Sequence, residues 1–133
     1  MTDANGCTAQ TTVVITQPTL LTATTTQVNV LCNGNSTGSA TVTGAGGTTP
    51  YTYLWTPSAQ TTATATGLAA GTYTVVVTDA HGCTVQQIVT ITQPTALALT
   101  TSFVQSTCGN ANGTATVVAS GGTPAYKIGR AHV

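Results

Sequence analysis

The chain repeats itself at an offset of 76 residues, and this repeat constrains its folding more than any other feature. The stretch TDANGCTAQTTVVITQPT at 2–19 and the stretch TDAHGCTVQQIVTITQPT at 78–95 are identical at 13 of 18 positions. After one deletion, residues 38–51 also align with residues 113–126. Because each unit of a tandem repeat is one structural unit, the fold must be sought inside a single copy.

The repeat boundaries predict one complete copy between partial ones. Residues 19–94 form the complete copy, which a Gln-Pro dipeptide precedes and ends. Residues 1–18 correspond to the C-terminal end of a preceding copy and 95–126 to the N-terminal half of a following copy, so we expect neither to bury a full core alone. Residues 127–133, KIGRAHV, break the threonine-rich style and resemble a translated sequencing adapter, so we expect a non-native tail.

Short alternating apolar and polar stretches, separated by Gly- and Pro-rich turns, predict strands throughout the complete copy. The expected strands are 20–31, 39–43, 51–55, 61–66, 72–79 and 83–93. Their number and spacing predict an all-β fold, a small sandwich of two sheets. The side chains expected to face its core are Ala40, Val42, Tyr51, Tyr53, Trp55, Tyr73, Val75, Val77, Val85, Val89 and Ile91.

The stretch LAAGTY at 68–73 resembles a tyrosine corner. In that motif the hydroxyl of the tyrosine, here Tyr73, bonds to the backbone a few residues upstream.

Charge is almost absent from the sequence. Threonine supplies 34 of the 133 residues, and the only basic residues, Lys127 and Arg130, lie in the tail. Because binding to phosphate backbones or anionic lipid requires cations, we expect no nucleic-acid partner and no attraction to such membranes. The apolar runs are too short for membrane insertion.

The alternating residues Asp79, His81 and Cys83 look at first like a chemical site. The other copy provides a control, because it has Asn5 in place of the histidine. We therefore interpret His81 as a turn residue, with the aspartate bonding to nearby backbone N–H groups. The only two acidic residues, Asp3 and Asp79, occupy the same repeat position 76 residues apart and cannot form a carboxylate pair within one copy, so we expect no enzyme, no cofactor and no metal site.

Four cysteines occupy two repeat positions, Cys7 with Cys83 and Cys32 with Cys108. Two cysteines per copy predict one disulfide per copy, which in the complete copy joins Cys32 to Cys83. Cys7 and Cys108 would then lack a partner and remain free or link between chains. Disulfides would place the protein in an oxidising compartment.

Three motifs carry a family resemblance: the start CNG…GSATV, GGTTPYTYLW and GTYTVVVTDAHGCT, all within residues 32–94. Together they resemble the SprB-type repeat of gliding-motility adhesins and related large surface proteins of Bacteroidota, and the resemblance extends over residues 1–126. It implies an immunoglobulin-like β-sandwich repeated in long arrays and exported to the cell surface.

The expected function is therefore that of a structural or adhesive repeat module in a large secreted bacterial surface protein. Its expected partners are neighbouring repeats of the same chain and a surface polysaccharide or abiotic surface. The alternative is a spacer or a carbohydrate-binding module in a secreted multidomain enzyme.

Overall fold

The computed structural model describes residues 1–129, and every regular element in that range is a β-strand. The strands are β1 (Thr22–Val28), β2 (Gly38–Ala45), β3 (Thr52–Thr56), β4 (Thr64–Leu68), β5 (Gly71–Thr78), β6 (Thr84–Ile91), β7 (Ala98–Val104) and β8 (Thr114–Ser120). The prediction of an all-β fold is confirmed.

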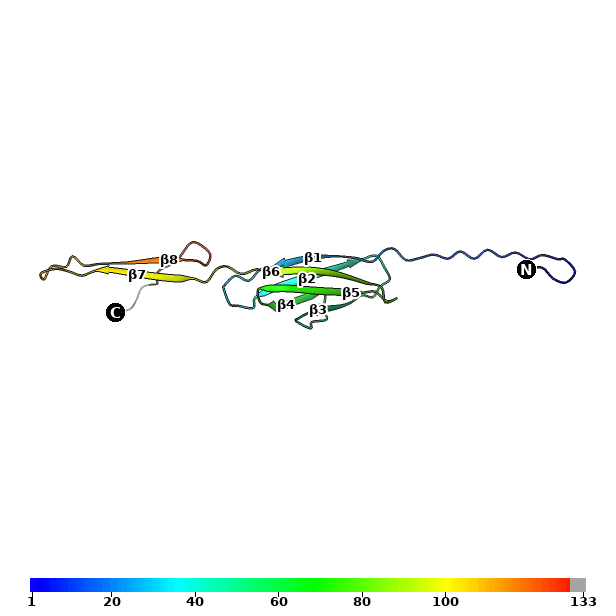
Figure 1. Ribbon diagram of the computed structural model, residues 1–133, viewed down its shortest axis with the longest axis horizontal. Coiled ribbons are helices and arrows are strands. Elements are labelled where there is room, and N and C mark those ends of the chain that lie inside the picture. Colours follow the sequence, from blue (N-terminus) through cyan, green and yellow to red (C-terminus); the bar gives the residue numbers. More distant parts are fainter. Residues whose placement is uncertain (130–133) are drawn as a thin grey trace.

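Strands β1 to β6 form a sandwich of two three-stranded sheets, with orders β1-β2-β4 and β3-β5-β6 (Figure 1). Strands β7 and β8 form a separate two-stranded sheet. All the strand pairs within these sheets are antiparallel.

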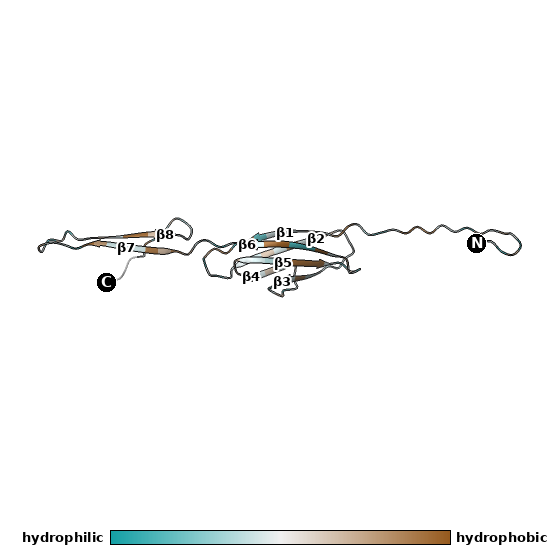
Figure 2. Ribbon diagram, in the orientation of Figure 1, coloured by the Kyte–Doolittle hydropathy of each residue, from teal (hydrophilic) through white to brown (hydrophobic). Residues whose placement is uncertain are grey.

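The core lies between the two sheets and is built mainly by the alternating residues of β2, β3, β5 and β6. Figure 2 shows hydrophobic residues along β3 and β5. Eight of the eleven predicted inward side chains are buried, and the other three, Tyr51, Tyr53 and Val85, are partly buried against them. Five further residues lie in the core although the alternation of the sequence did not predict them: Leu21, Ala23, Val30, Ala65 and Leu68.

Four predicted strands differ in length from the observed ones: 39–43 lengthens to β2 and 83–93 shortens to β6, while 61–66 and 20–31 change for reasons that the loops show. The predicted strand 61–66 becomes β4, which begins only at Thr64, because the preceding loop folds back on β3. The Trp55 N–H donates to the carbonyl oxygen of Gln60 at 2.9 Å, and the Trp55 indole Nε1 donates to that of Thr62, also at 2.9 Å. The predicted strand 20–31 shortens to β1, after which the Val30 N–H donates to the Thr92 carbonyl oxygen at 2.9 Å.

The sandwich has two ends, which we name by the path of the chain. At the entry end, residues 17–19 lead into β1, beside the turn between β5 and β6 (Figure 1, right). At the exit end, residues 92–94 leave β6 beside loop 29–37 (Figure 1, left). Strand β6 therefore runs the length of the sandwich from the entry end to the exit end.

Hairpin β7–β8 repeats the geometry of β1–β2 in the complete copy. The register that pairs Thr22 with Ala45 is the one that pairs their equivalents Ala98 and Ser120. The loop that follows is also reproduced, since the Gly47 N–H donates to the Thr19 carbonyl oxygen at 2.8 Å and its equivalent in the hairpin makes the same bond. The sequence repeat is thus a structural repeat.

The core-like face of this hairpin is open. Leu97, Leu99 and Val117 are 60%, 64% and 40% exposed, whereas their equivalents Leu21, Ala23 and Val42 are buried. In the predicted tail, Ile128 is 81% exposed. Residues 130–133 of that tail lie outside the described part of the chain.

Candidate functional site

The turn between β5 and β6 contains the carboxylate of Asp79, the imidazole of His81 and the thiol of Cys83. Asp79 is 5% exposed, and its carboxylate accepts three backbone hydrogen bonds. Oδ1 accepts from the N–H groups of His81 at 2.9 Å and Cys83 at 2.8 Å, and Oδ2 accepts from the N–H of Thr48 at 3.0 Å. The carboxylate therefore fastens the β5–β6 turn to the neighbouring loop after β2.

The equivalent turn at Asp3 shows which hydrogen bonds of the aspartate form within the turn and which require the rest of the sandwich. Asp3 accepts hydrogen bonds from the N–H groups of Asn5 at 2.9 Å and Cys7 at 2.8 Å, although the segment around it is exposed. The turn thus forms from local sequence alone, as Asx turns do. Only the bond from Thr48 depends on the sandwich.

These hydrogen bonds lower the pKa of Asp79. Burial acts to raise this pKa, but the three N–H donors, from Cys83, Thr48 and His81, together with the charge of His81 outweigh it. A carboxylate with a lowered folded-state pKa stabilises the fold above its unfolded pKa of about 3.9. That contribution disappears as the pH falls through the lower, folded-state value.

We expect Asp79→Asn to lower the melting temperature of the sandwich at pH 7 by about 5 °C or more, because the amide that replaces one oxygen cannot accept from Thr48. Fluorescence of Trp55, which is the one tryptophan of the chain, reports this melting. The difference between wild type and variant should shrink as the pH falls through the folded-state pKa of Asp79.

Asp3→Asn is the matched control, since it makes the same change in a turn with no contact to the sandwich. It should leave the melting temperature of the sandwich unchanged. Equal melting temperatures for Asp79→Asn and wild type would contradict the structural role of Asp79.

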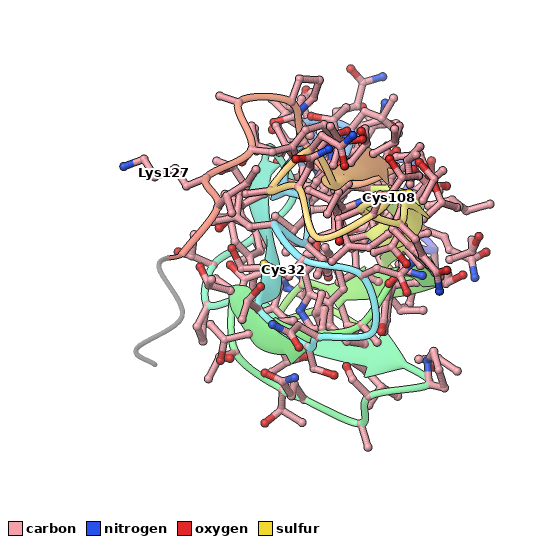
Figure 3. The ribbon with its side chains drawn as sticks, turned by 90° about the vertical axis from the view of Figure 1, so that its left-hand side faces the viewer. Cys32, Cys108 and Lys127 are labelled. Carbon is pink, nitrogen blue, oxygen red and sulfur yellow. The ribbon has the colours of Figure 1, made fainter. Side chains whose placement is uncertain are left out.

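The structure does not contain the predicted disulfide between Cys32 and Cys83. All four cysteines are free and exposed. Cys83 precedes β6 at the entry end, while Cys32 lies in the loop at the exit end, so the eight residues of β6, about 25 Å, separate them. A disulfide needs Cα atoms within about 7 Å of each other. Figure 3 looks along the sandwich from its exit side and labels Cys32 and Cys108.

Three of the four tyrosines, Tyr51, Tyr73 and Tyr126, anchor loops through their hydroxyl groups. The Tyr73 hydroxyl donates to the carbonyl oxygen of Ala69, four residues upstream, at 3.1 Å, which is the kind of bond a tyrosine corner makes. A second such bond was not anticipated: the Tyr51 hydroxyl donates to the Gly46 carbonyl oxygen at 2.5 Å. Tyr126 and Gly121 form the same pair at 2.6 Å, so the repeat GG…Y was the available signal.

Within residues 1–129, no group of three or more His, Cys, Asp or Glu side chains is placed to hold a metal ion. The same part of the chain has no helix long and apolar enough to cross a membrane.

The all-β fold and the structural repeat of β1–β2 in β7–β8 define an all-β tandem repeat module. The family model of the SprB repeat matches residues 24–60 and 100–128, two segments that begin at equivalent positions of the repeat. These segments are SprB-type repeats, as the resemblance predicted. The SprB repeat is a structural repeat family of large, adhesin-like surface proteins. Comparison with curated proteins and with solved structures gave no significant match.

Proposed function

We propose that the protein is a structural and adhesive module of a large secreted bacterial surface protein, without catalytic activity of its own. One observation carries the proposal: the chain enters the complete repeat at one end of the sandwich and leaves at the other (Figure 1). Copies linked in this way lie end to end, and the short Gln-Pro linkers limit their bending. Such an array forms an extended rod that displays many identical faces.

The strand order supports an immunoglobulin-like assignment. In an immunoglobulin sandwich, strands A, B and E share one sheet and C, F and G the other. The orders β1-β2-β4 and β3-β5-β6 correspond to these two groups. Modules with this arrangement are common in cell-surface proteins.

The contact between the first and last strands suits a module under tension. Near the entry end the Gln87 side-chain Nε2 donates to the Ala23 carbonyl oxygen at 2.9 Å. At the exit end the Thr92 N–H donates to Asn29 Oδ1 at 3.0 Å, beside the bond from Val30. Strands β1 and β6 thus run in the same direction, so tension on the two linkers shears several hydrogen bonds at once instead of opening them singly.

The outward faces suit weak contact with a neutral surface. The exposed residues of β1, β3 and β4 are mostly threonines, and residues 1–126 contain no lysine or arginine. Hydroxyl groups offer hydrogen bonds with little dependence on salt, in contrast to ion pairs. Many weak contacts along an array add up through effective concentration, so affinity resides in the array rather than in one copy.

The buried aromatic residues favour this role over a carbohydrate-binding module. Such a module would present aromatic rings to its sugar ligand, whereas Trp55 is 0% exposed and Tyr73 9% exposed. Tyr51 and Tyr53 pack against the same core. A spacer in a secreted multidomain enzyme remains the second candidate, supported by the same end-to-end path of the chain.

Retention on surfaces tests the adhesive role. Immobilised chains of residues 1–126, which contain no lysine or arginine, would be compared with the same chains after two or five further copies of residues 19–94 are inserted behind Pro94. We expect retention on polysaccharide and abiotic surfaces to rise steeply with copy number and to change little between low and high salt.

Two outcomes would contradict the proposal. Retention that does not grow with copy number would favour the spacer role. Tight, saturable binding of a small sugar by the shortest chain would favour a dedicated ligand-binding module.

A further inference from the structure

The loop that carries Cys32 is fastened to the linker that leaves the sandwich. The Asn33 side-chain Nδ2 donates to the Pro94 carbonyl oxygen at 2.9 Å, and the Gly34 N–H donates to Gln93 Oε1 at 2.9 Å. Cys32 itself accepts at its carbonyl oxygen from the N–H of a residue in the same loop and keeps its thiol exposed. The loop therefore holds the Cys32 backbone close to the Gln93–Pro94 linker.

The loop that carries Cys83 lies against the linker that enters the sandwich. Cys83 shares the lining of a shallow hollow with Gln17, Pro18 and Thr48. The carboxylate of Asp79 fixes the Cys83 backbone through its N–H at 2.8 Å. This second thiol is exposed as well.

The two linkers are the same element of the repeat. Gln17–Pro18 and Gln93–Pro94 occupy equivalent positions at the 76-residue offset. In an array, one linker therefore has the Cys32 loop of the preceding copy on one side and the Cys83 turn of the following copy on the other. Two thiols that lie at opposite ends within one copy converge between copies.

We propose that a disulfide clamps each Gln-Pro linker by joining the Cys32 position of one copy to the Cys83 position of the next. The inference rests on the proposed tandem array. The proposed partners of Cys32 and Cys83 belong to the neighbouring copies, at positions beyond residues 1–133. Cys7 and Cys108 are likewise at the ends of their copies that face away from the complete sandwich.

Formation of the clamp is an ordinary thiol–disulfide exchange. One cysteine thiolate attacks a sulfur of oxidised glutathione and releases one reduced glutathione, which leaves a mixed disulfide. The second cysteine thiolate then displaces the other glutathione. The two cysteines lose two electrons and two protons in total, and the glutathione disulfide accepts them. In an array the product restrains bending at every linker.

The test completes the following copy. Residues 1–126 would be extended by a second copy of residues 52–94, so that the added segment supplies one more cysteine equivalent to Cys83. After equilibration with oxidised glutathione, we expect the monomer to lose two free thiols. Peptide mapping without reduction should find Cys32 joined to the added cysteine.

Single substitutions in the extended chain identify the partners. Cys32→Ser should abolish the cross-link. Cys108→Ser and Cys83→Ser, the latter within residues 19–94 and not in the added segment, should leave it intact. A link between Cys108 and the added cysteine would show pairing within a copy and would overturn the proposal. A full count of free thiols in the extended monomer, with the circular dichroism of folded strands, would overturn it too.

A second variant does not depend on folding of the added segment. Thr123 is the equivalent of Thr48, which lines the hollow beside Cys83. Thr123→Cys in the 133-residue chain should therefore cross-link to Cys32 and not to Cys7, and failure to cross-link would count against convergence at the linker. These readouts are independent of surface retention: an array that adheres with all thiols free would disprove the clamp alone.

Discussion

Replacing Trp55 with alanine should leave most of the protein without its sandwich at 37 °C. Trp55 on β3 is fully buried, and its indole Nε1 donates to the Thr62 carbonyl oxygen at 2.9 Å. Loss of a buried tryptophan costs about 3–5 kcal/mol, and whole domains of this size are stable by only about 5 kcal/mol or slightly more. Because the variant lacks its only tryptophan, far-UV circular dichroism during urea and thermal unfolding is the measurement.

Leu54→Ala is the matched control, one residue away on the same strand. Leu54 points to the opposite face and is 49% exposed. Its removal should change the free energy of unfolding by less than about 1 kcal/mol. Similar losses for the two variants would mean that the core does not lie on the Trp55 face of β3.

The inward face of most strands could be predicted from the sequence because alternation is a local property. Val75 and Val77 on β5 and Val89 and Ile91 on β6 alternate with polar or less buried residues, and all four are buried. The misses lie where alternation is weak. In β4, TATGL offers one alanine and one leucine, and only pairing with β2 decides that Ala65 and Leu68 face inward.

The placement of Cys32 and Cys83 at opposite ends could not be predicted because it depends on strand direction across the whole sandwich. Strands joined by successive hairpins alternate in direction, which would bring the ends of the first and fifth strands to the same side. Here loop 57–63 crosses between the sheets, and β3 and β4 both run from the entry end toward the exit end. That one crossover sends Cys32 and Cys83 to opposite ends. Sequence spacing contains no information about it.

The loop that follows β2 at the entry end occurs twice in the chain, so its conformation can be compared between the two copies. The pairs Gly46–Tyr51 and Gly121–Tyr126 have the same hydrogen bond, although only the first pair belongs to a complete sandwich. The loop conformation is therefore encoded within the first two strands of a copy. The loop needs glycine because the chain that enters β1 passes very close to it at Leu20. Turn propensities alone do not predict this close approach.

Gly46→Ala should be the most damaging small substitution at the entry end. Gly46 has φ +73°, where an alanine costs about 1–2 kcal/mol. A Cβ there would also lie 2.0 Å from the Leu20 carbonyl oxygen and 2.9 Å from its carbon, both backbone atoms. Relief requires the chain entering β1 to move, which breaks the bond from the Gly47 N–H to Thr19. We expect a total loss of about 3 kcal/mol or more, measured by urea denaturation with Trp55 fluorescence.

Gly34→Ala separates backbone strain from the clash. Gly34 has φ +81° but no atom within 4 Å of the added Cβ, so only the cost of the left-handed conformation, about 1–2 kcal/mol, is expected. Gly121→Ala repeats the clash in the hairpin, 2.0 Å from the Ala96 carbonyl oxygen, and should leave the unfolding of the sandwich unchanged. If Gly34→Ala cost as much as Gly46→Ala, the close approach of Leu20 would have no energetic importance. If Gly121→Ala destabilised the sandwich, the hairpin would have to contribute to its stability, and the complete copy would not be an independent folding unit.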